Sequence, residues 1–295
     1  MNSSFCQIAS AIVGLSTAIA IFETIRSWLR LRHIPGPPLA GFSRLWLVWN
    51  SLKGRLAYAT EEASGKYGSL VRVGPNEIIS SDPDVWRKIL GVRTEYRRSD
   101  WFESIRWNPD GETLGTTLDN QAHKKLRSQL APGYSGKESN DHEKTMDRTI
   151  NKFVNFLGEK YLSTENAFRQ VDISEKLQYF SVEVISNLAF GKPFGNLDRD
   201  EDSLAYIHTT TKHLPLIGVA GFLPWLIRIV RSPIIKGIIS RGSDAMGLGE
   251  VVVWSENAIS ERLAAEKRPV KDILDSFISH GLTKAQLEGE MVGVM

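Results

Sequence analysis

Two side chains that are able to bind an anion lie four residues apart in a segment with a helical pattern. His123 and Arg127 occupy positions i and i+4, so both project from one face of a helix. An imidazole and a guanidinium suit an anionic group, and the guanidinium can donate a fork of hydrogen bonds. Lys124 and Lys125 lie between them, and an ordinary solvated helix face contains the same residue types. The spacing alone therefore leaves two interpretations open, an anion site and a solvated surface.

Metal-binding and nucleophilic residues show little organisation. The single cysteine, Cys6, excludes an intramolecular disulfide and a multi-cysteine zinc site. His142, His208, His213 and His280 have no metal-ligand spacing. The chain also lacks a Gly-x-Gly-x-x-Gly motif after a strand, a P-loop and a Gly-x-Ser-x-Gly elbow. We therefore expect no metal ligand and no catalytic residue of these classes.

Composition is that of an ordinary globular protein. The chain has 295 residues, 42% of them hydrophobic and 24% charged, with a formal net charge of +2. This length permits a sizeable core, and the composition argues against wholesale disorder. The balanced charge gives no reason to expect a nucleic-acid partner.

The first segment, residues 1–25, predicts a membrane anchor. Residues 5–22 are apolar apart from a few polar side chains, and a helix of that length nearly crosses a hydrocarbon core of roughly 30 Å. Positive charge follows at Arg26, Arg30 and Arg32. By the positive-inside rule, a single-pass anchor then places the N-terminus in the lumen and the domain in the cytosol. A cleaved signal peptide and a buried core helix are the alternatives.

The remaining chain divides into a hinge and a domain. Residues 26–38 predict a basic, proline-rich hinge, because three prolines exclude a helix there. Residues 39–295 predict a mainly helical domain with two short strands around a Gly-Pro-Asn turn at 74–76. Residues 91–120 show no period and predict a long irregular connection. Helices are expected near 83–90, 120–132, 141–161, 172–190, 200–214, 242–267 and 283–295.

Four segments in this order resemble the cytochrome P-450 family. They are the hinge Ile34–Pro38, the strand region Lys66–Ile78, the helix and turn His123–Ser135, and the helix with its glycine exit Asp172–Gly195. Within this family, the chain resembles fungal microsomal monooxygenases that are similar to pisatin demethylase. The resemblance implies a mainly α fold with a small β-sheet, the N-terminal half of the cytochrome P-450 fold preceded by a single transmembrane helix. It also implies the endoplasmic reticulum membrane as the location.

The resemblance also implies a cofactor, partners and site residues. In the family the pair at His123 and Arg127 faces haem b and binds a propionate, provided that haem is bound. An NADPH-cytochrome reductase and a small lipophilic substrate are the implied partners. Residues 100–118 resemble a substrate-recognition loop, with an ordinary surface loop as the alternative. Its candidate pocket walls are Trp101, Phe102, Ile105, Trp107 and Leu114.

The resemblance covers about the first half of the family's length. Residues 284–295 resemble the opening turns of the family's long central helix, before its oxygen-activating motif. Cys6 lies in the anchor and is not expected to be the haem ligand. We therefore expect a truncated, inactive homologue in which residues 172–190 and 283–295 have apolar faces without a partner. The alternative is a non-enzymatic, membrane-tethered remnant that binds a lipid or a partner protein. Residues 214–239, broken by prolines, resemble a lid over the substrate channel, with a plain buried connection as the alternative.

Overall fold

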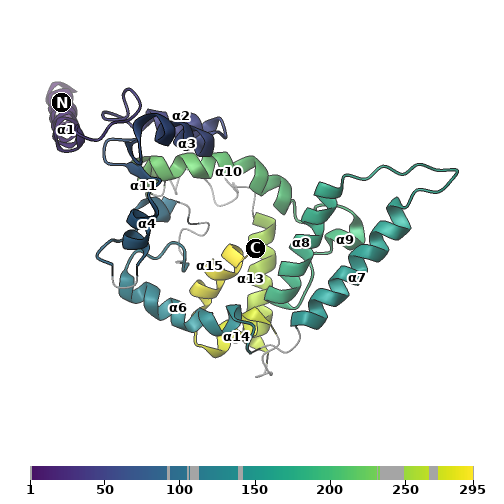
Figure 1. Ribbon diagram of the computed structural model, residues 1–295. Helices are drawn as coiled ribbons and strands as arrows, with labels where there is room; N and C mark the ends of the chain where they lie inside the picture. Colours follow the sequence, from purple (N-terminus) through teal and green to yellow (C-terminus); the bar gives the residue numbers. More distant parts are fainter. Residues whose placement is uncertain are drawn as a thin grey trace. The chain divides into compact units, whose positions relative to one another are not determined.

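The fold is mostly helical, with one two-stranded sheet among the described residues (Figure 1). The computed structural model describes residues 2–91, 94–104, 106, 113–138, 142–230, 232, 249–265 and 272–294. The chain divides into two compact units, Met1–Arg97 with Gly218–Leu223, and Arg98–Ile217 with Pro224–Met295. The prediction of a mainly α protein with a small sheet is confirmed.

The elements follow one another as helices interrupted once by a hairpin. Those up to residue 97 are α1 (Asn2–Leu31), α2 (Leu45–Leu52), α3 (Leu56–Tyr67), β1 (Leu70–Arg72), β2 (Ile78–Ser80) and α4 (Pro83–Leu90). Those that follow are α5 (Trp101–Ser104), α6 (Asn120–Tyr134), α7 (His142–Tyr161), α8 (Ile173–Phe190), α9 (Asn196–Arg199), α10 (Tyr206–Phe222), α11 (Pro224–Val230), α13 (Gly249–Ala264), α14 (Ile273–Ser279) and α15 (Lys284–Val294).

The β-hairpin forms where the sequence predicts it. β1 and β2 pair antiparallel, with Leu70 opposite Ser80. Successive side chains of a strand point to opposite faces, so Leu70 is exposed whereas Val71 is buried. Val71 and the following Val73 pack with Leu47 of α2 in the small core of the first unit.

Arg72 ties the hinge and the end of α1 to this hairpin. The residue is 3% exposed, and its guanidinium donates to the carbonyl oxygens of Ser27 (3.1 Å) and Pro75 (2.7 Å). Such acceptors are required because an unbonded buried cation is very unfavourable. The backbone N–H of Arg72 donates to the carbonyl of Pro35 (2.8 Å). A Cβ at Gly36 would lie 1.9 Å from the Arg72 carbonyl oxygen, so only glycine fits there.

Helix α1 differs from the predicted membrane anchor in two respects. It continues to Leu31 and so runs past the predicted boundary at residue 25. Among the described residues, no helix combines the length and the apolarity that crossing a membrane requires. The predicted transmembrane helix is therefore not supported. Polar side chains such as Gln7 interrupt the apolar run, and Glu23 and Arg26 occupy its later turns.

The core of the second unit lies between α6, α8, α13, α14 and α15. Phe190 of α8, Phe277 of α14 and Met291 of α15 are 1% exposed or less. Helix α15 packs against α13, α14 and α8 within this unit. Contrary to the prediction, α8 and α15 have partners for much of their apolar surface, while Ile173 and Leu177 of α8 remain exposed. Helix α14, absent from the predicted helices, is one of those partners.

Local capping accounts for helix ends that the sequence predicts well. Asp172 precedes α8, and its carboxylate accepts the backbone N–H groups of Ser174 (2.9 Å) and Glu175 (3.3 Å). Gly191 follows the helix with a φ of 67°, a left-handed conformation that glycine adopts without strain. These signals lie within a few residues of the ends, so they are readable from the chain.

Helix α10 differs from its prediction at both ends. It begins at Tyr206 rather than at 200, because Asp200 and Ala205 have φ values of 60° and 49°, which an α-helix does not allow. It continues through Pro215 to Phe222, past the predicted end at 214. The carboxylate of Asp200 instead forms an ion pair with the buried Lys176 (2.8 Å).

Candidate functional site

Helix α6 places His123 and Arg127 next to its buried stripe. The Asp119 carboxylate caps the helix by accepting the backbone N–H of Ala122 (2.7 Å). His123 and Arg127 share the helical stripe of the buried Leu126 and Leu130, at spacings of three and four residues. His123 is half-buried and Arg127 is exposed next to that stripe.

Lys124 and Lys125 serve as a comparison within the same helix. Both are exposed, and their positions lie on the side of α6 away from the buried stripe. Lys124 and Lys125 thus carry the same charge as Arg127 but do not lie next to the buried stripe, so they are suitable control positions.

Arg98 is a third cation at this place, and no local pattern predicted it. The positive charges of Arg98 and Arg127, after the larger effect of burial, lower the pKa of His123. These three residues form what we call the cation cluster. In the part of the chain that the structure describes, no carboxylate pairs with Arg98 or Arg127. The cluster therefore has cationic donors, and none of the described carboxylates forms an ion pair with its two arginines.

The guanidinium of Arg98 is held by the predicted substrate-recognition segment. Its Nη1 donates to the carbonyl oxygens of Leu114 (2.8 Å) and Thr117 (3.3 Å). Its guanidinium carbon lies 5.5 Å from the centre of the Phe102 ring, a cation–π distance. Arg98 thus joins two predicted pocket residues, Phe102 and Leu114, to the cation cluster.

The other predicted pocket walls fall into two groups. Trp101 and Phe102 open the short helix α5, are half-buried, and meet edge to face with ring centres 5.2 Å apart. Leu114 is half-buried and packs against the core of the second unit. Ile105 and Trp107 lie outside the described residues.

Glu290 of α15 is a further site residue that the sequence reasoning did not identify. It is 4% exposed, and its Oε1 accepts the backbone N–H of Leu114. Burial raises the pKa of Glu290 to about 7, and the hydrogen bond from Leu114 opposes this rise. A signal existed, because Glu290 lies on the apolar stripe of Leu287 and Met291. A carboxylate on such a stripe is rarely a surface group.

The donor set fits the carboxylates of a haem. Two guanidinium groups and an imidazole that gains a proton readily in an anionic field match two propionates in charge and hydrogen-bond donors. Among the described residues, no three His, Cys, Asp or Glu side chains are grouped to hold a metal ion. Cys6 lies in α1.

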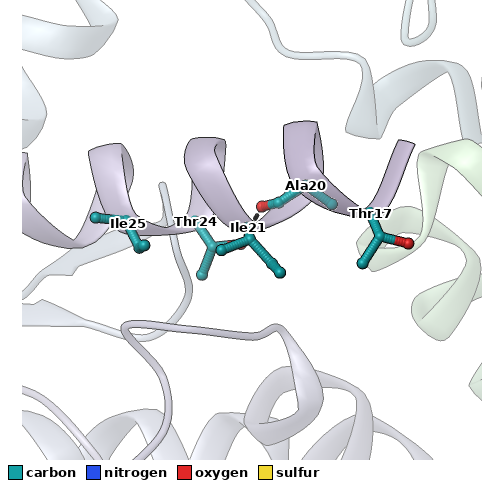
Figure 2. A pocket seen from close by; sticks show the side chains of 5 residues that line it. All are labelled: Thr17, Ala20, Ile21, Thr24 and Ile25. Carbon is teal, nitrogen blue, oxygen red and sulfur yellow. Dashed lines mark hydrogen bonds between the residues drawn. The ribbon is translucent and has the colours of Figure 1, made fainter. Parts of the chain in front are cut away.

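A shallow depression on α1 provides no comparable chemistry. Figure 2 shows its lining residues along one side of the helix, and the Thr24 hydroxyl donates to the carbonyl of Ala20 at 2.7 Å. No charged side chain lines it. It therefore is not a candidate cofactor site. Its lining residues are Thr17, Ala20, Ile21, Thr24 and Ile25.

Comparison with known proteins agrees with the geometry. Residues 37–290 match the family model for cytochrome P-450. The chain is 32% identical to cytochrome P-450 monooxygenase ABA1 of Pyricularia oryzae, over 96% of this chain and 57% of that protein. It is 31% identical to cytochrome P-450 monooxygenase aba1 of Botryotinia fuckeliana, over 88% of this chain and 52% of that protein.

A shorter match is to inactive cytochrome P-450 monooxygenase lolP2 of Epichloe uncinata, 35% identical over 48% of this chain and 77% of that protein. The chain spans about half the length of the first two relatives, 57% and 52%. A match over residues 37–290 includes both the hairpin and the cation cluster. The chain therefore belongs to the cytochrome P-450 family.

Proposed function

We propose that this chain is the N-terminal part of a haem-thiolate monooxygenase that oxidises a small lipophilic secondary metabolite. In this proposal, Arg98, His123 and Arg127 bind the propionates of haem b. The relatives ABA1 and aba1 are named monooxygenases, which supports the reaction class. An NADPH-cytochrome reductase supplies electrons, as family membership suggests.

One observation carries the proposal. The cation cluster brings three basic groups together without a carboxylate partner among the described residues. Burial lowers the pKa of His123, and the like charges of Arg98 and Arg127 lower it further. A dianionic ligand removes the repulsion and gains charge-assisted hydrogen bonds. Such a cluster is stabilised by an anion and destabilised without one.

The substrate is expected to contact the segment that leads into this cluster. Trp101, Phe102 and Leu114 offer aromatic and aliphatic surface, and Arg98 contacts both Phe102 and Leu114. An apolar molecule gains from such a wall by losing contact with water. This supports a lipophilic substrate class.

We further propose that these 295 residues are not catalytic by themselves. Haem iron ligated by a cysteine thiolate supplies oxygen activation in this chemistry. The sequence contains one cysteine, Cys6, and it lies in α1, outside the residues 37–290 that match the family. The residues described here bind and orient haem and substrate, and the thiolate has no source among them.

The alternative function, a remnant that binds a lipid or a partner through uncovered helices, has less exposed apolar surface to rest on than the sequence indicates. It required apolar faces on residues 172–190 and 283–295 without a partner. Met291 and Phe190 are instead buried in the core of the second unit.

The propionate assignment is tested with hemin and its dimethyl ester. The double variant His123→Ala/Arg127→Ala is titrated by Soret absorption, with Lys124→Ala/Lys125→Ala as the matched control on the same helix. We expect the first pair to weaken hemin binding about a hundredfold or more, since it removes two charge-assisted bonds worth roughly 1.5–3 kcal/mol each. The control pair is expected to bind hemin as tightly as the unaltered chain. The uncharged ester is expected to bind the unaltered chain and both double variants with similar affinity. Equal weakening in both pairs would contradict the assignment.

The thiolate proposal has its own test. The haem-loaded chain is reduced and exposed to carbon monoxide, and the Soret band is recorded. We expect no thiolate-type band from these residues. Its appearance, with loss on Cys6→Ala, would show that the proposal about catalysis is wrong.

Attachment to the endoplasmic reticulum membrane through the apolar surface of α1 is also proposed. Exposed apolar side chains on α1, including Leu15 and Phe22, and the basic residues Arg26 and Arg30 support it. Carbonate extraction of microsomes tests attachment. We expect the full chain to stay in the membrane fraction and a chain without residues 2–25 to be released. Release of both would contradict the proposal.

A further inference from the structure

A buried carboxylate of α15 lies outside the proposed haem contacts. Glu290 is 4% exposed and belongs to the stripe of Leu287 and Met291 that faces the core. It accepts the backbone N–H of Leu114. A carboxyl group here is costly to ionise, and an apolar residue would avoid that cost. The contact with Leu114 is thus what distinguishes Glu290 from its apolar neighbours.

Leu114 is bound by both of its backbone polar groups. Within its turn, Thr113 and Thr116 bind each other: each backbone N–H donates to the hydroxyl of the other, at 3.0 and 3.2 Å. The N–H of Leu114 instead donates to Glu290, and its carbonyl accepts from Arg98 (2.8 Å). These two groups belong to the peptide bonds on either side of Leu114. Both ends of the residue are therefore fixed by side chains from outside the turn.

The position of Arg98 depends on the same turn. Its Nη1 binds the carbonyl oxygens of Leu114 and Thr117, and its guanidinium stacks over Phe102. Two carbonyls and an aromatic face leave a planar guanidinium little freedom. From this position its charge acts on His123.

We propose that Glu290 is a positioning residue for the cation cluster. By holding the N–H of Leu114 it fixes the carbonyl of the same residue, which holds Arg98 beside His123. The relay connects α15 to α6 across 176 positions of the chain, from Leu114 to Glu290. The relay itself does not depend on the proposed function; only the assignment of the cation cluster to haem propionates does.

The test compares two variants of the 295-residue chain that remove the same negative charge. Glu290→Gln keeps an oxygen that accepts the Leu114 N–H, whereas Glu290→Met keeps the side-chain length without that acceptor. Hydrogen exchange at the Leu114 amide measures the first link. We expect exchange about tenfold or more faster in the Met variant than in the Gln variant, as for a lost internal hydrogen bond. Equal exchange would overturn the proposal.

The pKa of His123 measures the second link. Histidine-selective NMR follows its titration, and His123→Asn identifies the signal among the six histidines. We expect a higher pKa in Glu290→Met than in Glu290→Gln, because only the former releases Arg98. Arg98→Met, made at a half-buried position, sets the upper limit of this shift and stays informative if Glu290→Met does not fold. An unchanged His123 pKa in Arg98→Met, or equal values in the two Glu290 variants, would refute the relay.

These readouts do not use haem, so the two proposals fail separately. If both links are found while hemin does not bind through the cluster, the proposed function is wrong and the relay stands. If hemin binds through the cluster and the links are absent, the relay is wrong and the proposed function stands.

Discussion

Replacement of Glu290 by glutamine is expected to change the pH dependence of stability. The pKa of this carboxyl rises from 4.5 to about 7 on folding, because burial removes water from the ionised form. Between these values the unfolded chain binds fewer protons than the folded chain, so raising the pH favours unfolding. Stability is therefore lost between about pH 4.5 and pH 7, and the loss is complete above that range.

The magnitude follows from the size of the shift. A pKa change from 4.5 to about 7 at a residue 4% exposed corresponds to about 3 kcal/mol, at about 1.4 kcal/mol per pKa unit. Between pH 5 and pH 8, about 2.5 kcal/mol of this cost develops. Glu290→Gln has no proton to exchange and keeps the acceptor for Leu114. Its free energy of unfolding, relative to the unaltered chain, should therefore rise by that amount over the same interval.

The assay is urea unfolding at several pH values between 5 and 8, followed by far-ultraviolet circular dichroism. The difference between the variant and the unaltered chain cancels the titration of all other groups, provided that they do not couple to Glu290. Tyr134, whose pKa burial raises, senses the Glu290 charge but titrates far above this range. A stability difference that is constant with pH would refute the reasoning, because it would mean that Glu290 ionises in the folded chain as it does in water.

Two further substitutions test the packing of the second unit. Lys176→Met should lower the free energy of unfolding by about 3 kcal/mol at pH 7, since it leaves the Asp200 carboxylate without the buried ammonium 2.8 Å away. Thermal unfolding measures this loss of stability, and a loss below about 1 kcal/mol would mean that the ion pair is solvated. Gly133→Ala should cost about 1–3 kcal/mol, because the new Cβ would lie 2.9 Å from the Phe277 ring. Gly158→Ala, on the open face of α7, is its control and should be neutral or stabilising in urea unfolding; equal effects of the two changes would contradict the packing.

Features governed by neighbouring residues were predictable from the sequence. The limits of α8 follow from the Asp172 cap and the left-handed Gly191, both within a few residues of the helix ends. The hairpin follows from its glycine–proline–asparagine turn and from the β-branched Val71 and Val73 beside it. The pairing of His123 and Arg127 on one helical face follows from the helical period alone.

Features that depend on burial were not predictable in the same way. Helix α14 has seven residues, too few to be stable in isolation, and it forms because Phe277 is buried between longer helices. The sequence predicted a long helix at the N-terminus. Its apolar run also predicted a membrane span, but the polar residues within the helix make it less apolar than a span requires.

The sequence by itself determined the family, the helical character of the chain and the two basic residues of α6, because each is written in short-range order or in several ordered segments. Only the tertiary structure decided that Arg98 and Glu290 belong to the same site. Arg98 lies in an irregular segment and Glu290 follows it by 192 positions, so no periodicity relates them. Both bind Leu114, because the buried stripe of α15 and the turn at Leu114 pack against one core, and a buried carboxylate there must find a backbone donor.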